Sequence, residues 1–133
     1  MNGQFSQIKW VRVILAALVV YVLSYLLVFL IVTGYATLLA FQARGAPDQT
    51  MIESFANQFA PWIGPVSLLI FTYLGARHGA RRVESAHELH GILLGALAGL
   101  ISLFSEGFGL VTLVTVVLTI AAGWLGGKQS IKG

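Results

Sequence analysis

Long apolar runs separated by short polar segments set the pattern of this chain. The first run is uncharged from Val13 to Ala43 and would reach about 46 Å as an α-helix, against a bilayer hydrocarbon core of about 30 Å. It far exceeds the apolar core of a cleavable signal peptide, so we interpret it as a transmembrane helix. We predict one all-α domain over residues 1–133, a bundle of four transmembrane helices at about 11–41, 61–76, 87–104 and 109–126.

The longest polar connection lies between the first two predicted spans and carries a helical pattern of its own. Asp48 is a good N-cap, and apolar residues then recur at helical spacing between polar ones. We predict either a short amphipathic helix on the membrane surface or a loop packed on the helix ends. Pro61 suits the first turn of the second span, and Pro65 predicts a kink near its entry. The apolar residues of the pattern are Met51, Ile52, Phe55 and Phe59.

Composition supports a membrane protein and narrows its partners. Hydrophobic residues make up 57% of the chain and charged residues 10%, whereas soluble domains carry about 25% charged residues. The absence of cysteine excludes disulfides and thiolate sites. The net charge of +3 comes from basic residues at the ends of apolar runs, which indicates topology determinants. We therefore predict the lipid bilayer as partner, and no nucleic acid.

The distribution of basic residues predicts the orientation. With four spans, only Arg44 lies on one side of the membrane, and all the other counted basic residues lie on the opposite side. Short cytoplasmic segments are enriched in Lys and Arg, so we predict that both termini are cytoplasmic. The basic residues on the predicted cytoplasmic side are Lys9, Arg12, Arg77, Arg81, Arg82, Lys128 and Lys132.

The third predicted span carries Gly91, Gly95 and Gly99 on one face, a glycine zipper pattern. Small residues let helix backbones approach closely in lipid, so this face should meet another helix. That helix belongs either to the same chain or to a second copy or partner membrane protein. We expect Gly95→Leu to disrupt the fold or the assembly, and Leu94→Ala to leave it intact.

The fourth predicted span carries Thr112, Thr115 and Thr119 on one stripe. The stripe indicates either helix packing with hydroxyls bonded to nearby carbonyls, or the wall of a polar pathway. No ionisable residue lies in the middle of any predicted span, which argues against a proton-coupled carrier. A passive pore built by several copies stays open as an alternative.

The link between the second and third spans holds the only dense polar chemistry. Glu84 and His87 have the spacing of a carboxylate–imidazole metal pair, and His90 lies one turn further on. One pair supplies too few ligands, so we favour a solvated helix start and predict no metal and no cofactor. We predict that the basic residues of this link contact anionic lipid headgroups; they are Arg77, Arg81 and Arg82.

The glycine and basic motifs together resemble a family of small uncharacterised bacterial four-helix membrane proteins. The resemblance implies a location in the bacterial inner membrane and supplies no activity. Its motifs are Gly75-Ala76-Arg77-His78-Gly79-Ala80-Arg81-Arg82, His90-Gly91 with Gly95, and Gly123 with Gly126-Gly127.

From these features we predict a non-enzymatic accessory, scaffold or self-assembling membrane protein. The first alternative is an oligomeric passive channel or carrier for a small solute. A metal-dependent membrane enzyme is the third hypothesis and the one that the sequence favours least.

Overall fold

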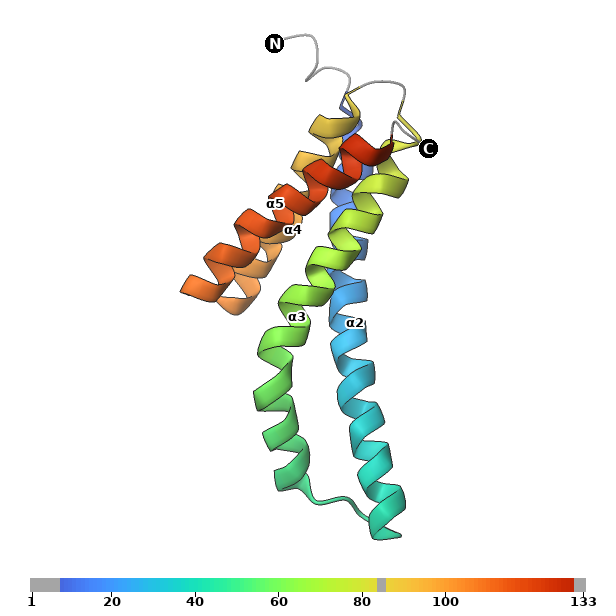
Figure 1. Ribbon diagram of the computed structural model, residues 1–133, viewed down its shortest axis with the longest axis vertical. Coiled ribbons are helices and arrows are strands. Elements are labelled where there is room, and N and C mark those ends of the chain that lie inside the picture. The colour runs from blue at the N-terminus through green and yellow to red at the C-terminus, as the bar shows by residue number, and fades with distance from the viewer. Residues whose placement is uncertain (1–7, 84–85, 131–133) are drawn as a thin grey trace.

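The computed structural model describes residues 8–83 and 86–130, which form four long helices packed as a bundle (Figure 1). These are α2 (Trp10–Ala43), α3 (Gln49–Ala80), α4 (His87–Glu106) and α5 (Leu110–Gln129). Each is long and apolar enough to cross a membrane. The all-α four-helix prediction is confirmed, and the chain is a small integral membrane protein.

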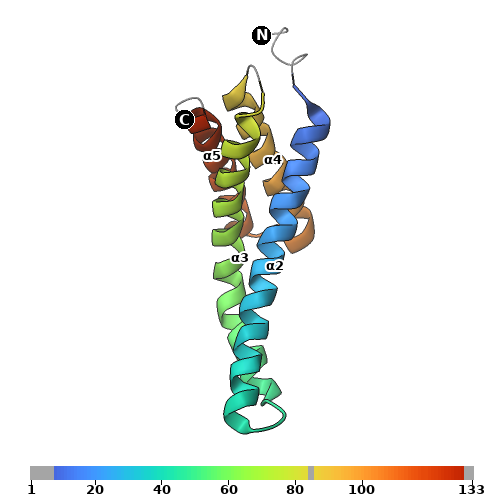
Figure 2. The same ribbon diagram turned by 90° about the vertical axis from the view of Figure 1, so that its right-hand side faces the viewer.

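The four helices form two hairpins of unequal length. α2 and α3 have 34 and 32 residues, whereas α4 and α5 have 20 each. At 1.5 Å per residue the short pair measures about 30 Å, the thickness of the hydrocarbon core, and the long pair about 50 Å. Figures 1 and 2 show α2 and α3 continuing well past the turn between α4 and α5. We call this end the loop end, and the opposite end, where α2 begins and α5 finishes, the terminal end.

The predicted surface helix and the predicted start of the second span at residue 61 are both wrong. Asp48 does cap a helix, because its Oδ1 accepts a hydrogen bond of 2.9 Å from the Thr50 backbone N–H. That helix, however, is α3 itself, which runs unbroken through Pro61 and Pro65. A proline removes only one backbone hydrogen bond from a long helix, so other contacts can hold it together.

The first turns of α3 contact α2 through aromatic side chains. The rings of Tyr35 and Phe55 stack with centroids 4.0 Å apart, and Phe59 lies 4.7 Å from Phe55. Phe55 of this segment therefore packs against the neighbouring helix, whereas Met51 and Phe59 stay exposed. Spacing along the sequence shows that an apolar face exists but does not show what covers it.

α4 contacts all three of the other helices, and its buried surface is wider than the glycine face alone. Leu94, next to that face, is only 3% exposed and belongs to the core. Leu94→Ala would leave a cavity there, so it is not the neutral change that its sequence position suggests.

Candidate functional site

The predicted glycine face lies inside the chain, against α5. A Cβ atom at Gly91 would collide with the backbone of Gly123, and one at Gly95 with the carbonyl of Thr119. At Gly99 a Cβ atom would lie 2.8 Å from Thr119 Oγ1. Only glycine allows this separation of the two backbones. Since α5 already covers the face, a second copy of the chain has no access to it in this arrangement.

The three threonines of the predicted polar stripe are buried in the bundle. Thr119 is fully buried, and Thr112 and Thr115 are 7% and 4% exposed. The Thr115 hydroxyl donates to the Val111 carbonyl and the Thr119 hydroxyl to the Val116 carbonyl, each at 2.8 Å. Hydroxyls bonded within their own helix and packed against glycine backbone favour the packing interpretation of the stripe over the pathway.

His90 joins α4 to the start of α2 at the terminal end. Its Nδ1 lies 2.9 Å from the Ala86 carbonyl, and its Nε2 accepts a bond of 3.3 Å from the Lys9 backbone N–H. A carbonyl only accepts, so the proton of the neutral ring must be on Nδ1. Both ring nitrogens are thus engaged, and a metal could bind His90 only by displacing one of these partners.

The other two residues of the weak metal candidate add little to it. Glu84 lies outside the described residues, and His87 is half-buried at the first turn of α4. Over 8–83 and 86–130, no group of three or more His, Asp or Glu side chains could hold a metal ion.

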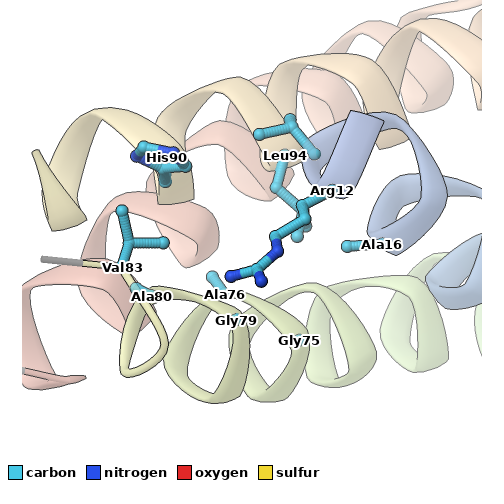
Figure 3. A pocket seen from close by; sticks show the side chains of 10 residues that line it. Arg12, Ala16, Gly75, Ala76, Gly79, Ala80, Val83, His90 and Leu94 are labelled. Carbon is cyan, nitrogen blue, oxygen red and sulfur yellow. The ribbon is translucent and has the colours of Figure 1, made fainter. Parts of the chain in front are cut away.

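The basic residues Arg12, Arg77, Arg81 and Arg82 all lie at the terminal end, near the start of α2 or the end of α3. Arg12 Nη1 donates to the Arg82 carbonyl at 3.2 Å, so a cation meets the carbonyl end of α3. Figure 3 shows Arg12 reaching toward Gly79 and Ala76 of α3, across a small cavity from His90 and Leu94. This cavity, of about 30 Å³, has room for roughly two water molecules.

Arg81 and Arg82 are exposed, whereas Arg77 is half-buried with no partner for its Nε in the described part of the chain.

A cleft of about 690 Å³ opens toward the loop end. One wall is α2 from Tyr21 to Val32, and the other is α3 from Ala56 to Leu68. Glu106 at the end of α4 and Thr112 on α5 close the side nearer the terminal end. The cleft exists because α4 and α5 stop here while α2 and α3 continue.

Two prolines change the backbone of the α3 wall. Proline has no N–H, so Pro61 leaves the Asn57 carbonyl without its helical donor, and Pro65 does the same to the Pro61 carbonyl. Asn57, Pro61 and Pro65 all line the cleft. One turn further on, the Ser67 hydroxyl donates to the Gly64 carbonyl at 2.9 Å, which is not one of the two carbonyls that the prolines free. The cleft thus combines apolar walls with backbone oxygens that lack a helical partner.

Sequence reasoning missed this cleft. The signal available was Pro61 and Pro65, four residues apart and therefore on one face of the helix. Placing Pro61 in the first turn of a span hid its effect, because a proline there has no preceding helical carbonyl to free.

Comparison with known proteins found no match: no family model, no curated protein and no solved structure is similar to this chain at a significant level.

Proposed function

We propose that this protein is a non-enzymatic subunit of a membrane assembly, which it joins through the loop-end half of α2. The observation that carries the proposal is the unequal length of the two hairpins. About 20 Å of α2 and α3 extends beyond the ends of α4 and α5 and is not covered by them.

The extension presents large apolar side chains that the chain itself does not cover. Leu38 is 58% exposed and Phe41 is 82% exposed, although α2 has almost no polar residues with which to face water. A helix of this kind is stable in lipid or against another apolar helix. A partner helix that packs along the extension would cover these side chains.

A location in the bacterial inner membrane, with both termini in the cytoplasm, belongs to the same proposal. Basic residues at the terminal end, with Arg44 alone at the loop end, support this orientation. Arg77, Arg81 and Arg82 would then contact anionic headgroups of the inner leaflet. The resemblance of the glycine and basic motifs to small bacterial membrane proteins supports the same location.

The test is mild extraction from native membranes, followed by mass determination and identification of proteins that co-purify. We expect a complex of fixed stoichiometry, larger than the 14.3 kDa chain. Leu38→Gln should abolish it, whereas Leu100→Gln should preserve it, because Leu100 is a comparably exposed residue (45%) on α4. A monomer with nothing bound, or equal behaviour of the two variants, would overturn the proposal.

The alternative of a passive channel receives less support. The three threonines on which it depended are buried, and the hydroxyls of Thr115 and Thr119 are bonded within α5. Flux of an ion or a small neutral solute into liposomes that disappears in the Thr112, Thr115 and Thr119 to Val variant would restore it.

A further inference from the structure

The cleft described above has the charge and hydrogen-bonding character of a binding site for a cation. Glu106 supplies a carboxylate, and no Lys or Arg is among the residues that line the cleft. The lining also includes Asn57 and Pro61, whose carbonyls lack helical donors. A carboxylate, together with carbonyls that have lost their helical donors, attracts a group that is positive and donates hydrogen bonds.

Aromatic rings add to this preference. Tyr21 and Tyr25 both line the cleft, with ring centroids 6.3 Å apart, and Phe29 follows one turn along α2. The face of an aromatic ring carries negative potential and attracts ammonium groups. Tyr25 is 70% exposed, so its ring is available to a ligand.

Most of the remaining lining residues are apolar, which favours a ligand that also has an apolar part. Val28, Val32 and Leu68 are among these residues. The cleft also lies where α4 and α5, about 30 Å long, come to their ends.

We propose that the cleft binds an amphiphile with an ammonium head and a single apolar chain, which enters from the bilayer. The head lies near Glu106 and the freed carbonyls of α3, with the faces of Tyr21 and Tyr25 beside it. The chain follows the apolar groove between α2 and α3.

Radiolabelled dodecylamine tests the proposal, with protein immobilised in dodecyl maltoside and protein-free resin as background. We expect saturable binding of one dodecylamine per chain. Dodecanol, which has no charge, should compete at least tenfold more weakly, and dodecanoate should not compete measurably. Stronger competition by dodecanoate than by dodecanol would overturn the proposal.

Variants separate this site from general adsorption. Glu106→Gln should weaken dodecylamine binding by about tenfold, since it removes the charge and keeps the shape. The matched control is Glu53→Gln, which neutralises an exposed carboxylate on α3 away from the cleft and should bind like the parent protein. Equal affinity in the two variants would contradict the assignment.

Pro61→Ala with Pro65→Ala tests the carbonyls independently of the charge. Alanine returns the missing N–H donors, so binding should fall severalfold while the helix becomes no less stable. Unchanged binding in this variant, with circular dichroism showing a folded chain, would also count against the proposal.

Discussion

Gly91 of α4 and Gly123 of α5 meet backbone to backbone, and a Cβ atom added to either would collide with the carbonyl group of the other. The same relationship recurs along the helix pair, where Gly127 faces the carbonyl of His87. Contacts between bare backbones leave no side chain that could rearrange to relieve a clash. We therefore regard α4 and α5 as a closely matched pair that a single methyl group can disturb.

Gly95→Ala should destabilise the fold, because its Cβ would collide with the Thr119 carbonyl and lie 2.9 Å from Ile120 Cα. Overpacking of this kind costs about 1–3 kcal/mol. Gly79→Ala is the matched control, since a Cβ atom at Gly79 of α3 meets nothing within 4 Å. Alanine is the better helix former by about 0.5–1 kcal/mol, so this variant should be neutral or slightly stabilised.

Reversible unfolding in mixed micelles, followed by circular dichroism, measures both variants on one scale. If Gly79→Ala proved as destabilising as Gly95→Ala, the close approach of α4 and α5 would not be the cause. An intact fold with a changed oligomeric state in Gly95→Ala would indicate that the glycine face meets another copy.

The neutral ring of His90 should carry its proton on Nδ1, because Ala86 offers a carbonyl to Nδ1 and the Lys9 N–H donates to Nε2. The ¹⁵N chemical shifts of the imidazole nitrogens distinguish the two neutral tautomers directly. The exposed His78 on α3 serves as the internal comparison. A proton on Nε2 of His90 would show that its contact with Lys9 does not form.

The sequence predicts the helices well because a bilayer imposes strong demands on composition and length. The observed bounds of α2, α4 and α5 lie within three residues of those predicted. The spacing of Gly91, Gly95 and Gly99 likewise indicates a face for close packing. It gives no partner, however, because α2, α3 or a second chain could each have covered that face as α5 does.

The start of α3 and the cleft could not be predicted, because both depend on contacts between helices. Polar residues such as Glu53 and Asn57 ended the apolar run and suggested a separate element. In the structure Phe55 packs on Tyr35, which extends α3 beyond the predicted span. The cleft in turn follows from the difference in hairpin length, which depends on that extension.

Thr119→Val should leave stability unchanged to within about 1 kcal/mol, because the hydroxyl bonds to the carbonyl of Val116 in its own helix. Valine keeps the volume of the fully buried side chain. Thr119→Leu should instead be destabilising, since Gly99 packs directly against this side chain. The same unfolding assay compares the two variants, and a large loss in Thr119→Val would reveal a hydroxyl contact outside α5.

Asp48 should make the first turn of α3 sensitive to acid. The hydrogen bond from the Thr50 hydroxyl, at 2.6 Å, and that from the Thr50 N–H hold the pKa of Asp48 below its ordinary value of 3.8. A carboxyl whose pKa is lowered by folding stabilises the folded state fully above its ordinary pKa. That contribution is lost as the pH falls through the lower, folded value.

The carboxyl ¹³C resonance of Asp48 measures this pKa in the folded protein. We expect Thr50→Ala to raise it part of the way to the ordinary value, because the hydroxyl bond is lost while the backbone bond remains. Asp48→Asn should keep the start of α3 helical at every pH, since the amide oxygen still caps the helix but does not titrate. An Asp48 titration that Thr50→Ala leaves unchanged would mean that the Thr50 hydroxyl does not contact the carboxylate in solution.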